Sequence, residues 1–117
     1  MSAHILSVTE IATLAARALR NHGASETQAE VLAAGVAAAE RDGLRSHGLM
    51  YLTPYCEHLA CGKVIGQALS VLSRAAHASF VVDAHSGFAC AAIDLGLPTL
   101  IAAAPANATL LKLAEVA

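Results

Sequence analysis

The chain has 117 residues, of which 56% are hydrophobic, 3% aromatic and 14% charged, with a formal net charge of −2 at pH 7. Nine acidic residues against seven basic ones argue against a nucleic-acid-binding surface, and three cysteines without a CxxC pair indicate neither a disulfide framework nor a zinc ribbon. The charged fraction is well below the usual quarter of a soluble chain, which predicts a surface that a second subunit or further polypeptide covers.

The first predicted element is a helix that begins after Ser7. Ser7 followed by Glu10 is a capping box, and apolar residues at helical spacing define one face. The helix is expected to run to about Asn21 and to stop at Gly23, because glycine readily ends a helix.

A second helix is predicted after Ser25. Ser25 with Gln28 repeats the start signal of the first helix, and a stripe of alanine, leucine and valine residues follows at helical spacing. Small residues on this stripe let two helices approach closely, so we expect the first two helices to pack together. The second helix should end near Asp42-Gly43.

The third predicted element begins between Ser46 and Thr53 and continues to Gly62. Thr53 can cap a helix, and Pro54 suits its first turn because proline lacks an N–H that would be unpaired there. The sequence leaves open whether one helix or two short ones occupy this stretch.

Beyond Gly62 the pattern changes to that of strands. Residues 69–73 and 79–83 read as two strands joined by residues 75–78, in a hairpin or at a sheet edge. Gly87 is then expected to open an alanine-rich helix through Ile93, which Pro98 interrupts or ends. Residues 105–107 form a second break, and residues 108–113 are a candidate for a further strand.

This order of elements predicts an α+β fold. A three-helix N-terminal segment is followed by the beginning of a mixed sheet with a helix, in the manner of a βαβ unit. We expect a helical N-terminal domain over residues 1–66 and a second, sheet-containing domain that starts over residues 67–117. Two or three strands alone are marginally stable, so the sheet is expected to need partners.

The richest chemistry lies in residues 42–55. Ser46, His47, Tyr51 and Tyr55 place a hydroxyl, an imidazole and two phenols at one helix entrance, where backbone N–H groups favour an anionic ligand such as a carboxylate. Neutral histidine can accept and return a proton near pH 7. The structural alternatives are that Ser46 is only a helix cap and that Tyr55 only packs its helix against a neighbour.

Two runs of residues resemble the malate/L-lactate dehydrogenase family of the non-Rossmann type. The first, residues 42–62, contains Ser46-His47-Gly48 followed by Tyr55 and a terminal glycine, and the second is Val82-Asp83-Ala84-His85-Ser86-Gly87-Phe88. The resemblance covers roughly residues 8–92. Since family members are much longer, it implies that this chain is the N-terminal part of such an enzyme, with residues 67–117 starting a cofactor-binding α/β domain, and that the chain alone is inactive.

The resemblance implies hydride transfer between NAD or NADP and a small 2-hydroxy acid, such as malate, lactate or ureidoglycolate, or a cyclic 2-imino acid. His47 would handle the proton and Ser46 would orient it, while Tyr51 and Tyr55 would contact the substrate. The family usually has arginine where Tyr51 stands, so Arg45 is a candidate to hold the carboxylate instead. Most of the nicotinamide site is expected outside this chain.

The odd cysteine set and a start without a secretory signal predict a cytoplasmic chain, and the low basic charge predicts no nucleic-acid partner. The uncharged run over residues 95–111 is short and contains two prolines, so it is not expected to span a membrane. The resemblance implies a small carboxylic acid as substrate. A homodimer or association with a complementary segment is expected. The sequence departs from the family pattern at Ala89, where a second glycine is usual, and at Pro98 and Pro105, which interrupt a normally long helix. The alternative function is a non-catalytic helical interaction module in which Ser46 and His47 are only helix caps.

Overall fold

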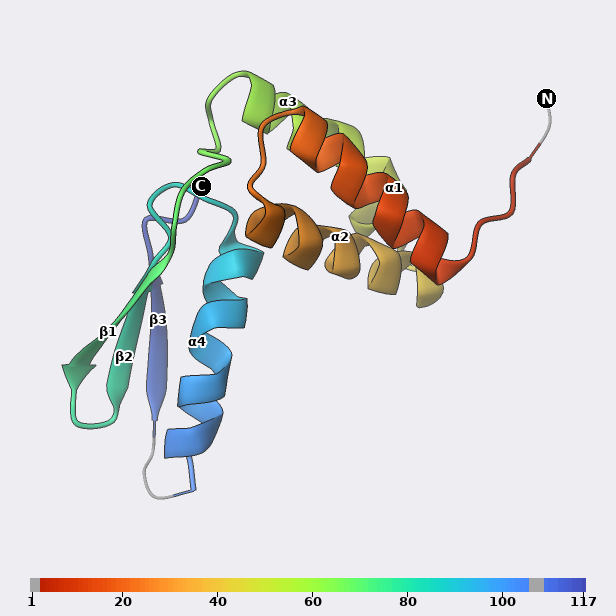
Figure 1. Ribbon diagram of the computed structural model, residues 1–117. Helices are drawn as coiled ribbons and strands as arrows, with labels where there is room; N and C mark the ends of the chain where they lie inside the picture. Colours follow the sequence, from red (N-terminus) through yellow and green to blue (C-terminus); the bar gives the residue numbers. More distant parts are fainter. Residues whose placement is uncertain (1–2, 106–108) are drawn as a thin grey trace.

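The fold consists of a helical N-terminal layer followed by a small sheet that one helix covers (Figure 1). The computed structural model describes residues 3–105 and 109–117. The elements are α1 (Val8–Asn21), α2 (Glu26–Arg41), the 3-10 turns η1 (Arg45–His47) and η2 (Leu49–Tyr51), α3 (Leu52–Ala60), β1 (Val71–Ala76), β2 (Ser79–Asp83), α4 (Ala89–Ala103) and β3 (Leu110–Ala114). The predicted α+β class with a mixed sheet is confirmed.

The predicted capping box of α1 is present in both directions. The Ser7 hydroxyl accepts a hydrogen bond from the Glu10 N–H at 3.1 Å, and the Glu10 carboxylate accepts one from the Ser7 N–H at 2.7 Å. The helix ends at Asn21, and Gly23 follows with φ +104°, a conformation that favours glycine. The predicted bounds of α1 are therefore confirmed.

The second capping box is only half formed. The Ser25 hydroxyl accepts a hydrogen bond from the Gln28 N–H at 3.3 Å, but the Gln28 side chain turns away from Ser25 and is buried, with 2% of the residue exposed. Its Nε2 lies 3.1 Å from the carbonyl oxygens of Ile65, Gly66 and Ala68. The predicted return bond of the capping box, from the Ser25 N–H to the Gln28 side chain, is absent. The Gln28 side-chain oxygen accepts from the Phe88 N–H at 2.8 Å instead, and the Ser25 N–H donates to the Gly66 carbonyl at 2.7 Å.

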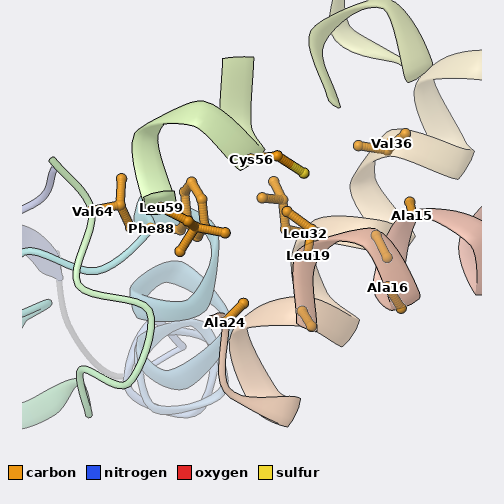
Figure 2. Close-up of a cluster of buried hydrophobic side chains, with 12 residues drawn as sticks. Ala15, Ala16, Leu19, Ala24, Leu32, Val36, Cys56, Leu59, Val64 and Phe88 are labelled. Atoms are coloured by element: carbon orange, nitrogen blue, oxygen red, sulfur yellow. The ribbon is translucent and has the colours of Figure 1, made fainter. Parts of the chain in front are cut away.

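The main core lies where α1, α2 and α3 meet the start of α4 (Figure 2). Small side chains on α1 and α2 let the two helices pack closely, as the sequence predicted. Phe88 inserts its ring beside Leu59 and Val64 at the far end of this core. The buried residues of the cluster are Ala15, Ala16, Leu19, Ala24, Ala29, Leu32, Ala33, Val36, Cys56, Leu59, Val64 and Phe88.

The sheet has the order β1-β2-β3 and is mixed. β1 and β2 form an antiparallel hairpin, whereas β2 and β3 run parallel and are joined through α4, which confirms the βαβ arrangement. The predicted first strand, residues 69–73, is displaced in the structure: β1 begins at Val71 and includes Ala75 and Ala76, which were expected in the connection. Pairing with β2 overrides the weak strand preference of alanine.

Helix α4 runs without interruption from Ala89 to Ala103, with Pro98 inside it. The prediction that Pro98 interrupts or ends this helix is wrong. Proline removes one backbone donor, but burial of the α4 face against the sheet holds both halves in one helix. The helix does end before Pro105, as predicted, whereas residues 106–108 of the predicted break and strand lie outside the described residues.

The chain leaves a large apolar surface exposed. It exposes 7115 Å², whereas a compact monomer of 11.9 kDa exposes about 6,000 Å². The radius of gyration is 15.7 Å, above the roughly 13 Å of a compact domain of this length. On α4, Ile93, Leu95, Leu97 and Ile101 are all at least 42% exposed. No helix among the described residues is long and apolar enough to span a membrane.

Candidate active site

The candidate site is built on the connection between α2 and α3. α2 ends at Arg41, and Gly43 adopts φ +77°, which turns the chain away from the helix axis. The connection then forms η1 and η2 before α3 begins at Leu52. This answers the question that the sequence left open: two 3-10 turns precede a single short α-helix.

Glu40 fixes the middle of this connection. Its carboxylate accepts a hydrogen bond from the Leu49 backbone N–H at 2.8 Å. Gly48 is buried directly against the Glu40 side chain, so that a Cβ at this position would lie 2.8 Å from the Glu40 Cγ. Because only glycine leaves room for this contact, Gly48 and Glu40 together hold the backbone that follows His47.

Ser46 and His47 are both exposed on η1. The residue before η1 is Leu44, and no side chain caps this turn, so the alternative interpretation of Ser46 as a helix N-cap is wrong. The His47 N–H donates to the Leu44 carbonyl at 3.0 Å, which fixes the backbone but leaves the imidazole outside the core. An accessible imidazole can exchange protons with a ligand.

Thr53 does not cap α3, because the residue before this helix is Tyr51 and no side chain caps it. The prediction for Thr53 is therefore wrong, whereas Pro54 lies in the first turn as expected. Arg45 is exposed on η1 and forms no ion pair with the acidic groups of residues 3–105 and 109–117.

Tyr51 and Tyr55 form an aromatic row with Phe88. The Tyr51 and Tyr55 ring centroids lie 4.9 Å apart at an interplanar angle of 69°, and those of Tyr55 and Phe88 lie 5.6 Å apart at 83°. These edge-to-face contacts join η2 and α3 to the residue before α4. Burial is the main reason that the pKa of the Tyr55 phenol is raised, with smaller contributions from Cys90 and Tyr51.

This aromatic row is one wall of a hollow of about 260 Å³. The residues that line it are Tyr51, Tyr55, His58, Lys63, Val64, Phe88 and Ala117. Two of the five site residues predicted from the sequence, Tyr51 and Tyr55, therefore lie together, whereas Arg45, Ser46 and His47 are outside this lining. Tyr55 packs against the core, as one of its two alternatives predicts, and it also lines the hollow, while its contact with a substrate stays a prediction.

Sequence reasoning missed Lys63 and His58 as lining residues. No motif in the sequence points to either residue: Lys63 directly follows Gly62 after the end of α3, and His58 lies on α3 between Cys56 and Cys61. Within the described residues, no group of three His, Cys, Asp or Glu side chains could hold a metal ion. Cys56 is buried in the core and Cys61 is exposed, so the two thiols near His58 differ in their surroundings.

A larger hollow, of about 350 Å³, lies between α1 and α3. Its lining is Ala18, His22, Leu52, Thr53, Cys56, Glu57 and Ala60. It contains none of the predicted site residues, and its lining is mainly apolar. The smaller hollow, with its phenols and Lys63, is better suited to bind a small acid.

Comparisons with known proteins agree on one family. The family model for malate/L-lactate dehydrogenase matches residues 6–111. Delta(1)-pyrroline-2-carboxylate reductase 2 of Burkholderia multivorans is 37% identical over 101 residues, 86% of this chain and 30% of that protein. Delta(1)-pyrroline-2-carboxylate/Delta(1)-piperideine-2-carboxylate reductase of Pseudomonas putida is 41% identical over 96 residues, 82% of this chain and 28% of that protein.

The fold has been seen before in a solved structure. Malate dehydrogenase from Pyrococcus horikoshii OT3 superposes with a TM-score of 0.83 at 18% identity, over 95% of this chain and 32% of that one. At this identity the likeness shows the fold alone. The chain spans about 30% of the length of the curated relatives that it matches.

Proposed function

The chain belongs to the malate/L-lactate dehydrogenase family, and from this premise we propose that it forms the N-terminal part of an oxidoreductase for small 2-hydroxy acids or cyclic 2-imino acids. The similarity to pyrroline-2-carboxylate reductases supports cyclic imino acids in particular. Because the chain spans about 30% of these relatives, the activity belongs to a longer polypeptide or to a complex. The 117 residues alone are expected to be inactive.

In this proposal His47 transfers the proton that accompanies reduction. When C2 of the substrate gains a hydride, the imine nitrogen or carbonyl oxygen gains a proton, and the imidazole is a suitable donor near neutral pH. The observation that carries this role is the exposed His47 side chain on η1, next to a backbone that Glu40 holds in place. Ser46 is the neighbouring hydroxyl that would orient the imidazole or relay its proton.

The substrate acid is proposed to bind beside the aromatic row. Tyr51 and Tyr55 line the 260 Å³ hollow, where their rings suit a small carbon skeleton and their hydroxyl groups can donate hydrogen bonds. Arg45 lies on the same connection between α2 and α3 and is a second candidate to meet the carboxylate.

The reaction class requires a nicotinamide, NAD or NADP, as hydride donor or acceptor. The described residues do not fit such a dinucleotide: no glycine-rich phosphate loop precedes α4, and the 260 Å³ hollow suits only a small molecule. The contribution of this chain is therefore substrate binding and proton transfer, and we place the nicotinamide site on further polypeptide.

The exposed apolar residues of α4 support a further part of the proposal. Ile93 and Ile101 are 43% and 61% exposed on a helix whose other side packs on the sheet. The relatives are about three times longer, so we assign this surface to the polypeptide that follows in them, supplied by the same or another chain. A homodimer formed through this surface is the competing outcome, and sedimentation analysis distinguishes the two.

A chimera tests the proposed function. Residues 6–117 replace the matching segment of the Burkholderia multivorans reductase, and oxidation of NADH and NADPH is followed with Delta(1)-pyrroline-2-carboxylate and with 2-oxo acids. Turnover that falls at least a hundredfold in His47→Ala, with an unchanged circular dichroism spectrum, is expected. Full activity of His47→Ala, or no turnover by a folded chimera, would favour the alternative of a non-catalytic interaction module.

A further inference from the structure

Two basic side chains, Lys63 and His58, and no acidic side chain line the hollow beside Tyr51. The remaining lining side chains are aromatic or aliphatic, and the C-terminal residue Ala117, which carries the terminal carboxylate, completes the lining. Lys63 makes no ion pair with any acidic group in the described part of the chain, the terminal carboxylate included. A hollow with cationic and phenolic donors is complementary to a small anion.

The backbone of Lys63 is held on both sides. Gly62 adopts φ +80° after the end of α3, and the buried Val64 donates its N–H to the His58 carbonyl at 3.1 Å. The next residue, Ile65, donates to the Ser86 carbonyl at 2.9 Å. The Lys63 side chain thus starts from a turn whose backbone is fixed, at the edge of the hollow.

The aromatic row determines the shape of the hollow. Tyr51 and Tyr55 present two rings in an edge-to-face arrangement, and Phe88 closes the row. About 260 Å³ accommodates a five- or six-membered ring that bears one carboxylate, with the ring against the aromatic wall. A carboxylate in this position would face the Lys63 side of the hollow.

We propose that Lys63 is the cation that binds the substrate carboxylate in this chain. The inference rests on the proposed function for the identity of the acid. It replaces the charge that the family's arginine would bring at position 51, where this chain has an uncharged tyrosine. Arg45 is the competing cation: like His47 it lies on η1, outside the lining of the hollow, so the binding test includes Arg45→Gln beside Lys63→Gln.

The first test measures binding to the 117-residue chain without turnover. The isotope-labelled chain is titrated with cyclopent-1-ene-1-carboxylate, a stable isostere of the cyclic imino acid, and NMR signals of Tyr51, Tyr55 and Lys63 are followed. Saturable shifts are expected for the acid and not for its uncharged carboxamide. Lys63→Gln should weaken binding about tenfold, while Lys63→Arg stays within about threefold and Arg45→Gln within about twofold of the unmodified chain.

A double variant and a chain with an amidated C-terminus test whether Lys63 supplies the cation. Adding Tyr51→Arg to Lys63→Gln should restore most of the lost affinity, because it returns a cation to the lining of the same hollow. A chain with an amidated C-terminus controls for the carboxylate of Ala117, which lines the hollow, and should bind the acid at least as well. Equal binding by Lys63→Gln and weaker binding by Arg45→Gln would overturn the inference.

The chimera separates this inference from the proposed function and covers the case in which the short chain shows no binding. There, Lys63→Gln should raise KM about tenfold and change kcat less than twofold, since the ammonium binds substrate but takes no part in proton transfer. An unchanged KM for Lys63→Gln in an active chimera refutes only the role of Lys63 and leaves the proposed function standing. If the carboxylate binds through Lys63 but the folded chimera shows no nicotinamide-dependent turnover, only the proposed function is refuted.

Discussion

The side-chain oxygen of Gln28 accepts a hydrogen bond from the backbone N–H of Phe88 at 2.8 Å, across 60 positions of sequence. The amide nitrogen of the same residue faces three carbonyls of the segment between α3 and β1. One buried side chain therefore joins α2 to the entry of the sheet and to the start of α4. Phe88 in turn ends the aromatic row of the candidate site, so Gln28 also helps to position that row.

Gln28→Ala is expected to lower the free energy of unfolding by about 2–4 kcal/mol, because it leaves buried carbonyl groups and the Phe88 N–H without their partner. Urea denaturation of the 117-residue chain measures this loss. Gln67→Ala is the matched control: Gln67 donates to the Gly23 carbonyl at 3.0 Å but is exposed, so water can replace it and the loss should stay below about 0.5 kcal/mol. Equal losses in both variants would contradict the role of Gln28.

The role of Gln28 illustrates what the sequence could not predict. A glutamine three residues after a serine matches a capping box, and the local pattern does predict the start of α2. Only the tertiary structure brings residues 65–68 and Phe88 close enough to compete for its amide. The prediction at Pro98 was wrong for the same kind of reason. Proline inside a helix does cost stability, but the packing of α4 on the sheet outweighs this local cost.

The candidate site was predictable in part. Tyr51 and Tyr55 were named from the sequence and lie together at one hollow, because they follow each other at helical spacing at the start of α3. Lys63 could not be found in this way, since it comes after the helix and reaches the hollow through the turn at Gly62. The roles of Ser46, His47 and Arg45 remain predictions that the experiments above test.

Gly96→Ala should destabilise the packing of α4 on the sheet. A Cβ at this position would lie 2.7 Å from the Val82 Cγ2 and 3.0 Å from the Leu111 Cδ1, and Val82 is fully buried. We expect a loss of about 1–3 kcal/mol in thermal or urea unfolding. Gly35→Ala on α2 provides the opposite control, because nothing lies within 4 Å of its Cβ and alanine favours a helix; it should gain up to about 1 kcal/mol. A gain in stability for Gly96→Ala, as for Gly35→Ala, would show that α4 lies less closely on β2.

The three cysteines should differ in reactivity. Burial raises the pKa of the Cys56 thiol and is the main cause of the raised pKa of Cys90, whereas Cys61 is exposed. At pH 8, iodoacetamide should modify Cys61 at least about tenfold faster than the other two, as followed by peptide mass spectrometry. Equal rates at all three positions, with the chain folded, would show that Cys56 and Cys90 are accessible to solvent.

The same raised pKa values predict how stability depends on pH. The folded chain holds the protons of Cys56 and Cys90 to higher pH than the unfolded chain does, so their contribution is complete below the unfolded pKa of about 8.5 and is lost as pH rises through the folded values. The free energy of unfolding should therefore fall above about pH 8.5. In Cys56→Ala/Cys90→Ala this fall should be smaller, measured against each variant's own stability at pH 7.

Glu40 provides a test of how the backbone beside His47 is held. Glu40→Ala removes the acceptor of the Leu49 N–H, so the Leu49 amide should exchange with solvent at least about tenfold faster, while the free energy of unfolding changes by only about 1 kcal/mol. Glu40→Gln keeps a carbonyl oxygen at this position and should retain most of the protection. Glu30→Ala, on an exposed position of the same helix, should leave Leu49 unchanged.

Gly48→Ala should have the same effect as Glu40→Ala although it leaves the carboxylate in the chain. The added Cβ would approach the Glu40 Cδ to 2.7 Å, so the flexible carboxylate has to move, and its bond to Leu49 is then broken. In the chimera both variants should lower kcat more than they raise KM, because the imidazole of His47 is displaced while the hollow at Tyr51 is kept. Rapid exchange of the Leu49 amide already in the unmodified chain would contradict this account, since the bond that both variants are meant to break would then not be stable.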